Sequence, residues 1–405
     1  MADNDNKKQV WSWALFDFAN SSFAVIIVAF VFAVYFKKVV AQDLPIGDWY
    51  WSLAIAISMT IVAILNPILG AVADFHSNKK SFLLFFTLLS IVATSLLYFS
   101  KEGMIFYAMV VFIVANIGFQ IGLGFYDAFL PEIAEEKDFN RISSLGYAVG
   151  YAGSFLSVLI VLPLKGEPRI TFLVTSIMFF LFSLPLFLFL KERKQSIEQT
   201  QESFFLIGLH RVRSTLKNIS QYSNLKNFLL SYFIYIDGMN TIIFFSGIFA
   251  QSTLKFSIEE LAYFFILVQL TALIGSLLFG KLANTFGTKQ TLSFNLCAWL
   301  IICVVMYFIQ TKMMFFIIGS VAGLFLGSTQ AISRSIMSSL TPQEKKAELF
   351  GFYALFDKTA TILGPIAFGA ISFLSGSERF AALSIGIFFI VGAFLLQKVN
   401  LAPKI

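Results

Sequence analysis

The chain has 405 residues, of which 58% are hydrophobic and 13% charged, and its formal net charge is +6. Soluble domains carry about 25% charged residues, so this composition excludes a water-soluble globular protein and requires a lipid bilayer around most of the chain. The positive charge follows from membrane topology, and we expect no nucleic-acid partner.

The apolar runs predict twelve membrane-spanning helices, because roughly 20 apolar residues cross the hydrocarbon core. The predicted fold class is therefore an all-α polytopic membrane protein with two six-helix bundles, at 1–190 and 227–405, joined by a linker at 191–226. The expected spans are 11–36, 49–73, 81–99, 104–130, 141–163, 170–190, 227–250, 259–283, 290–310, 314–338, 347–374 and 380–397. Lysine and arginine are concentrated in loops on one side, which predicts that both termini are cytoplasmic.

Spans one and seven carry the same polar pair. Asp17 and Asn20 recur as Asp237 and Asn240, both 220 positions later (237 − 17). Residues three apart lie on one helix face, and ionisable groups inside spans face a cavity or a partner. We expect both pairs to bind substrate or protons, with Asp237 as the leading proton or amine site. The alternative is an acid held by neighbouring Ser, Asn or backbone groups that only fixes helix packing.

A short motif occurs at the end of the second span and again at the end of the eighth. The first copy reads Gly70-Ala-Val-Ala-Asp74-Phe-His-Ser-Asn-Lys79-Lys80, and the second has Gly280, Asn284 and Lys289 at a constant offset of 210 (280 − 70). A repeat at half the chain length indicates a duplicated bundle. We expect both copies to act as conformational switches, with Asp74 facing the positive N-terminal end of span eleven.

The linker opens with Lys191-Glu-Arg-Lys and a polar run. Apolar residues then recur at helical spacing opposite basic ones, which predicts an amphipathic helix on the inner lipid surface, with a solvated linker helix as the alternative. The apolar positions are Phe205, Leu209, Val212 and Leu216, and the basic ones are His210, Arg213 and Lys217.

Further charges lie within or beside the second-half spans. Arg334 is expected either to hold a substrate carboxylate or to pair with Asp17 or Asp127 as an inner gate. Lys358 is expected to pair with Asp127 in the same way. Its neighbour Asp357 points about 100° away on the helix, so the two need not neutralise each other.

Small and amide residues complete the predicted sites. Gln120 and Gln269 are expected to line the pore. Small residues form one face of the fifth span and one of the eighth, either at a seam between the bundles or in packing within one bundle: Gly146, Gly150 and Gly153, and Gly275 with Ser276. Gly364-Pro365 should kink span eleven. No metal, nucleotide or nucleophile motif is found, so we expect no cofactor and no enzyme activity.

The 6+6 repeat, the long central loop and the two motif copies resemble the major facilitator superfamily. Three stretches resemble its branch of autophagy-related vacuolar amino-acid effluxers and their bacterial relatives: Trp13-Ala-Leu-Phe-Asp17-Phe-Ala-Asn20, Gln330-Ala-Ile-Ser-Arg334, and the run from Glu348 to Lys358. The sequence departs from the pattern at Asn284, where an acid is usual, and at Asp357, where a small residue is usual.

The resemblance implies a secondary active transporter that works by alternating access, with proton-coupled export of a small polar metabolite such as an amino acid. Its partners would be a small-molecule substrate, protons and the lipid bilayer of a bacterial inner membrane, and we expect it to act as a monomer. Two alternatives remain open. One is an exporter of a drug, a lipid or an iron-chelate compound, and the other is a non-transporting membrane sensor that signals through the linker.

Overall fold

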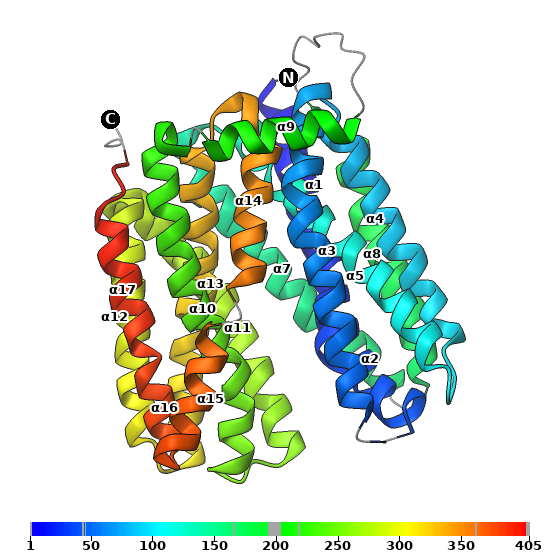
Figure 1. Cartoon of the computed structure of the whole chain (residues 1–405), viewed down its shortest axis with the longest axis vertical. Helices are drawn as coiled ribbons and strands as arrows, with labels where there is room; N and C mark the ends of the chain where they lie inside the picture. Colours follow the sequence, from blue (N-terminus) through cyan, green and yellow to red (C-terminus); the bar gives the residue numbers. More distant parts are fainter. Residues whose placement is uncertain are drawn as a thin grey trace. The chain divides into compact units, whose positions relative to one another are not determined.

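The computed structural model describes residues 2–42, 44, 46–164, 167–192, 204–217, 219–360 and 363–401, and the regular elements of these residues are helices (Figure 1). The α-helices are α1 Ala2–Phe23, α2 Val31–Tyr35, α3 Ile46–His76, α4 Lys79–Leu96, α5 Ile105–Asp127, α6 Leu130–Ile133, α7 Phe139–Val161, α8 Pro168–Phe189, α9 Phe204–Lys217, α10 Ser223–Ser252, α11 Ile258–Phe286, α12 Thr288–Phe308, α13 Lys312–Leu340, α14 Lys346–Thr359, α15 Leu363–Ser375, α16 Glu378–Ser384 and α17 Gly386–Gln397. The all-α fold class predicted from the sequence is confirmed.

Eleven helices in the described part of the chain are long and apolar enough to cross a membrane. The eleventh predicted span, 347–374, consists of two shorter helices, α14 and α15, neither of which reaches spanning length alone. The kink that Gly364-Pro365 predicts is thus an interruption of the helix. Large apolar side chains such as Phe85 and Phe106 are exposed on the spans, as a lipid-facing surface requires.

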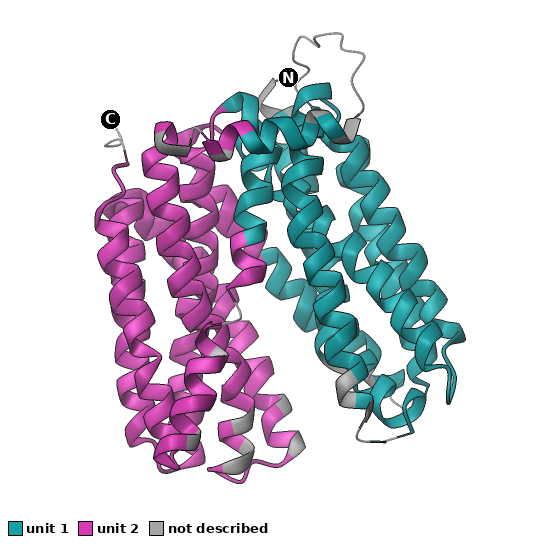
Figure 2. Ribbon diagram, in the orientation of Figure 1, with its two compact units in different colours: residues 1–134, 149–213, 343–355 teal, residues 135–148, 214–342, 356–405 magenta. Residues whose placement is uncertain are grey.

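The chain forms two compact units (Figure 2). Unit 1 contains residues 1–134, 149–213 and 343–355, and unit 2 contains residues 135–148, 214–342 and 356–405. The predicted linker 191–226 is divided between the units at residues 213 and 214, and two further segments lie in the unit of the other repeat. Residues 135–148 of the first repeat belong to unit 2, and residues 343–355 of the second repeat belong to unit 1. We call these the exchanged segments.

The exchange is reciprocal. The second exchanged segment begins 208 positions after the first (343 − 135), close to the offset of 210 between the motif copies. Each segment contains the start of a helix, α7 in unit 2 and α14 in unit 1. Both repeats therefore contribute the start of a helix to the other unit, and they do so at nearly equivalent positions.

Glycines allow close helix contacts inside each unit. On α13, Gly319, Gly323 and Gly327 recur every fourth residue, and a Cβ at Gly323 or Gly327 would overlap α11. In unit 1, a Cβ at Gly153 of α7 would lie 2.7 Å from the Cα of Phe18 on α1. Gly150, Gly153 and Gly275 of the predicted small-residue faces thus make close contacts within a unit, and a role of these faces at a seam stays a prediction.

Alanine at Gly275 will destabilise unit 2. Its Cβ would overlap the carbonyl oxygen of Leu324 on α13, and overpacking of this kind costs about 1–3 kcal/mol. We expect the melting temperature of the purified protein to fall by several degrees. Gly369→Ala is the matched control, because no atom lies within 4 Å of a Cβ at that position. Equal melting temperatures for the two variants would contradict the assigned packing.

The predicted linker helix is present as α9, and the polar run at 193–203 that precedes it lies outside the described residues. Its glycine packs on unit 1, and the lipid-facing arrangement expected for its apolar residues stays a prediction. Gly208 is buried, and a Cβ there would lie 2.6 Å from the carbonyl oxygen of Ile68 on α3, whereas Leu206 and Leu209 are exposed. Hence α9 is packed against unit 1 through a glycine rather than through its leucines.

Candidate gate and cargo sites

The first motif copy holds the exchanged segment 343–355 inside unit 1. Gly70 of α3 lies against the start of α14, and a Cβ there would overlap the carbonyl oxygen of Ala347. One turn later, Asp74 accepts a 2.8 Å hydrogen bond from the backbone N–H of Glu348. This N–H belongs to the first turn of α14, where an acid also meets the positive end of the helix dipole. Asp74 therefore lies where the sequence predicts it.

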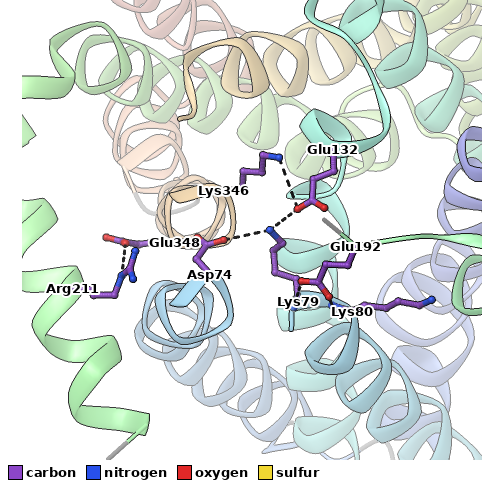
Figure 3. Close-up of polar contacts among 8 residues, drawn as sticks. All are labelled: Asp74, Lys79, Lys80, Glu132, Glu192, Arg211, Lys346 and Glu348. Carbon is purple, nitrogen blue, oxygen red and sulfur yellow. Dashed lines mark hydrogen bonds and ion pairs between the residues drawn. The ribbon is translucent and has the colours of Figure 1, made fainter. Parts of the chain in front are cut away.

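Asp74 is part of a buried charge cluster with Lys79, Glu132 and Lys346 (Figure 3). Lys79 Nζ lies 3.5 Å from Asp74 Oδ1 and forms an ion pair with Glu132 Oε1, which is 3.9 Å from Lys346 Nζ. These side chains are at most 4% exposed. Two acids and two bases alternate, so the cluster balances its charge without water, and Lys346 ties the exchanged segment into it.

Lys80 and Lys289 bind backbone carbonyl oxygens, whereas Lys79 pairs with acids. Lys80 Nζ donates to the carbonyl oxygen of Leu190, directly after α8. Lys289 Nζ donates to the carbonyl oxygens of Gln397 and Val399 at the end of α17, at 2.8 Å each. Both lysines therefore cap the carbonyl end of the last helix of their repeat. The constant offset pairs Lys289 with Lys79, but its contacts correspond to those of Lys80.

The second motif copy holds the other exchanged segment, 135–148, inside unit 2. A Cβ at Gly280 of α11 would overlap the side chain of Ser144. Asn284 Oδ1 accepts a 3.1 Å hydrogen bond from Asn140 Nδ2. An amide pair thus stands where the first copy uses a carboxylate and a backbone N–H, so the second copy also makes a polar contact with its exchanged segment.

Arg334 of α13 also binds the segment 135–148. Its Nε donates to Ser143 Oγ at 3.0 Å, its Nη2 donates to Ser143 O at 2.8 Å, and its guanidinium lies 4.1 Å from the ring centroid of Tyr147. The side chain is buried. These contacts fix the exchanged segment 135–148 to α13, and both predicted roles, a site for a substrate carboxylate and a gate with Asp17 or Asp127, stay predictions.

In unit 1, Asp17 of α1 is buried in an aromatic environment. Its Oδ2 accepts a 3.1 Å hydrogen bond from the Tyr126 hydroxyl, and Trp13 stacks on the Tyr126 ring with centroids 4.6 Å apart. Gly150 of α7 lies opposite, where a Cβ would be 3.3 Å from the carboxylate. Asn20 is buried on the same helix, and its Nδ2 has no hydrogen-bond partner among the described residues. An acid and an unsatisfied amide thus share one buried face.

In unit 2, the corresponding face of α10 binds the interruption between α14 and α15. Both carboxylate oxygens of Asp237 lie 3.0 Å from the backbone N–H of Gly364, and Asn240 Nδ2 donates to the carbonyl oxygen of Ala360 at 3.3 Å. Asp237 is completely buried. Its partners are backbone groups, as in the packing alternative that the sequence leaves open. The residue nevertheless lies where two helix ends meet, so its charge state bears directly on the interruption.

Asp357 and Lys358 form an ion pair with each other, although they are adjacent on the helix. Lys358 Nζ lies 2.6 Å from Asp357 Oδ2, and Asp357 Oδ1 accepts a 2.8 Å hydrogen bond from the Tyr232 hydroxyl. The long lysine side chain spans the angle between adjacent positions. The pairing of Lys358 with Asp127, the half-buried last residue of α5, stays a prediction.

The two predicted pore amides lie in different surroundings. Gln120 of α5 is buried in unit 1. Gln269 of α11 lines a cavity of about 110 Å³ in unit 2, together with Phe264, Phe265 and Trp299. Its Oε1 is buried and accepts no hydrogen bond from the described residues. The cavity is therefore apolar with one amide available to a bound group.

Sequence reasoning did not select several charged residues that the structure brings to this site: Glu132, Glu192, Arg211, Lys346 and Glu348. Four of them lie at or near span ends and Arg211 lies on the linker helix α9; charged residues are ordinary at both places, so their types and positions carry no signal by themselves. The one available signal was Glu348, an acid inside the predicted span 347–374, where an ionisable group needs a partner.

Glu192 caps the start of α4 from the segment after α8. Its Oε1 accepts from the Lys79 N–H at 2.6 Å and its Oε2 from the Lys80 N–H at 3.1 Å. Burial raises the pKa of Glu192, and the two N–H groups offset this only in part. A carboxyl whose folded-state pKa is raised contributes stability at low pH that is lost as the pH rises through the folded-state pKa.

Glu192→Gln will therefore change how stability depends on pH. We expect the melting temperature of the native protein minus that of the variant to decrease as the pH rises from about 4 to about 7. Glu135→Gln is the control with opposite sign, because the hydrogen bond and charge of Lys137 lower the pKa of Glu135. If the Glu192 difference grows with pH, burial does not dominate at this carboxyl.

The fold has two compact helical units that exchange the segments 135–148 and 343–355, a duplicated glycine motif, and acids buried within the spans. This combination is that of a membrane transporter of the major facilitator type. The chain belongs to the family described as vacuole effluxer Atg22 like, whose profile matches residues 50–404. It is 33% identical to the MFS-type transporter YxiO of Bacillus subtilis (strain 168), over 97% of this chain and 95% of that one. It is 25% identical to autophagy-related protein 22-1 of Penicillium rubens, over 64% of this chain and 49% of that one.

Solved structures show the same fold. The human organic anion transporter MFSD10 (TETRAN) matches with a TM-score of 0.77 and 14% identity, over 97% of this chain and 99% of that one. The proton:xylose symporter XylE matches with a TM-score of 0.77 and 14% identity, over 99% and 97%. At these identities the similarity establishes the fold alone. The chain is a multi-pass transporter and not an enzyme.

Proposed function

We propose that this transporter works by alternating access and couples proton movement to the export of a small polar metabolite such as an amino acid. The observation that carries the proposal is the reciprocal exchange of 135–148 and 343–355 between the two units. Each segment is held by one close glycine contact and a few polar contacts, centred on Asp74 in unit 1 and Arg334 in unit 2. Such contacts can be broken and re-formed once per cycle.

Two buried acids are the proposed working residues. Asp17, beside the Tyr126 hydroxyl and the Asn20 amide, suits a cargo ammonium group. Asp237 is the proposed proton site, because protonation would weaken its two bonds to Gly364 and so alter the interruption between α14 and α15. Ionisable groups at such depth are costly to keep, which supports a role in transport.

The proposed direction of transport and orientation of the chain follow from the family and from the charge distribution. The family is described as a vacuole effluxer, and this supports export. The distribution of lysine and arginine supports cytoplasmic termini, and the Bacillus relative supports a bacterial inner membrane.

A second candidate is export of a compound with a bulky apolar part. It is favoured by the cavity of about 110 Å³ beside Gln269, whose other lining groups are mainly aliphatic and aromatic. An apolar cavity of this order accommodates a group the size of a benzene ring.

Flux measurements with the purified protein in liposomes test both candidates. We expect labelled amino acids to enter against unlabelled ones trapped inside, and to accumulate when a pH gradient is imposed. Protein-free liposomes and Gly70→Ala protein are the controls. If amino acids neither exchange nor accumulate in these liposomes, the amino-acid cargo is ruled out. Flux of a lysolipid or an aromatic drug instead would establish the second candidate.

A further inference from the structure

The linker helix α9 contacts the exchanged segment 343–355 through one arginine. Arg211 Nε lies 3.9 Å from Glu348 Oε2, and the guanidinium lies 5.6 Å from the ring centroid of Phe75 on α3. Figure 3 shows Arg211 reaching Glu348 from the side opposite to Lys79. One helix turn earlier, Gly208 lets α9 approach α3 at Ile68 and Val72. The helix is therefore placed so that Arg211 meets Glu348.

The Glu348 carboxylate depends on this contact. The side chain is completely buried, and neither carboxylate oxygen accepts a hydrogen bond from the described residues. The charge cluster does not neutralise it: Lys79 lies beside Asp74 and Glu132, and Lys346 pairs with Glu132. Asp74, which accepts the Glu348 N–H, adds a second negative charge nearby. Arg211 is thus the counter-charge that the structure assigns to Glu348.

A buried charge without a partner is far more costly than a buried pair or no charge at all. We infer that α9 is a latch of the transport cycle, in which Arg211 is a positioning residue that stabilises residues 343–355 inside unit 1 by neutralising Glu348. The inference rests on the proposed alternating access but not on the cargo. Opening of the latch would leave Glu348 unpaired, so release of the linker and release of the segment are coupled.

The exposed surface of α9 separates this role from lipid anchoring. Arg213 is two positions further on, is exposed, and lies outside the contact with Glu348. A helix that acts only through anionic lipid would use Arg213 as much as Arg211. These two arginines on one short helix therefore form a matched pair for experiment.

Hydrogen–deuterium exchange of the full-length protein in lipid nanodiscs, without cargo, tests the latch. We expect Arg211→Gln to raise the exchange rate of residues 343–355 by about fivefold or more, and to leave the α12 residues of unit 2 unchanged. Arg211→Lys should retain most of the protection, because it keeps the charge. Arg213→Gln should behave as the native protein does.

The double variant decides between charge and packing. With Glu348→Gln added, no charge needs neutralising, so Arg211→Gln/Glu348→Gln should return to within about twofold of native exchange. If the Arg211→Gln protein is obtained only in low yield on purification, a normal yield of the double variant supports the latch. A yield of the double variant that is as low as that of Arg211→Gln overturns it. Equal effects of Arg211→Gln and Arg213→Gln, or no suppression by Glu348→Gln, also overturn it. Absence of amino-acid flux would leave these outcomes unchanged.

Discussion

Alanine in place of Gly70 will displace residues 343–355 from unit 1 and reduce transport by about tenfold or more. The added Cβ would overlap the carbonyl oxygen of Ala347 and lie 2.9 Å from the Glu348 nitrogen. The obstructing atoms are backbone, so the segment itself must move, and the hydrogen bond from Glu348 to Asp74 lengthens. Overpacking of about 1–3 kcal/mol is enough to shift a two-state equilibrium by one to two orders of magnitude.

Two measurements check the Gly70 prediction. Hydrogen exchange of residues 343–355 should rise, and liposome flux should fall. Gly122→Ala on α5 is the matched control, since its Cβ would lie 3.9 Å from Thr87 Oγ1, which is an ordinary contact. Native exchange in the Gly70 variant would show that the close approach is not what holds the segment.

The architecture could be predicted because bilayer thickness fixes span length and duplication fixes the symmetry. The position of Asp74 at a helix start also followed, since an acid one turn after a glycine at a span end suits a positive helix terminus. The same reasoning did not find Glu132 or Arg211, because a charge at a span end or on a linker helix is unremarkable until its partner is known.

Side-chain reach explains the remaining errors. The constant offset pairs Lys289 with Lys79, yet Lys289 caps a helix end as Lys80 does. One step along a helix turns a side chain by about 100°, and a lysine is long enough to compensate for it. For the same reason, the angle between Asp357 and Lys358 did not keep them apart. Sequence spacing gives the direction of a Cβ, but not where a flexible ammonium group binds.

The interruption of span eleven was predicted only as a kink. Proline removes one backbone donor, but a neighbouring helix must also bind the groups that an interruption frees. Here α10 does so with Asp237 and Asn240, which bind groups on the two sides of the interruption. The Asp-x-x-Asn spacing and the proline were both visible in the sequence, while their juxtaposition depends on how α10 and α15 pack within unit 2.

Asparagine at position 237 will separate proton coupling from transport. The amide oxygen can still accept the Gly364 N–H, so the interruption should persist and the melting temperature should stay close to that of the native protein. An amide cannot take up a proton, so we expect uptake driven by a pH gradient to fall to the protein-free background. Exchange of labelled for unlabelled cargo without a gradient should remain within about twofold of native.

The matched acid in unit 1 gives the contrast. Asp17→Asn should reduce gradient-driven uptake and cargo exchange together, because Asp17 bonds to a tyrosine hydroxyl and is proposed to bind the cargo ammonium. If Asp237→Asn also loses exchange and melts at lower temperature, Asp237 only fixes the packing of α15. If it retains gradient-driven uptake, the proton binds elsewhere. Asp237 is the residue that couples proton movement to transport only if its asparagine variant loses pH-driven accumulation and keeps cargo exchange. That result would show that the residue binds the proton but is not needed to bind the cargo.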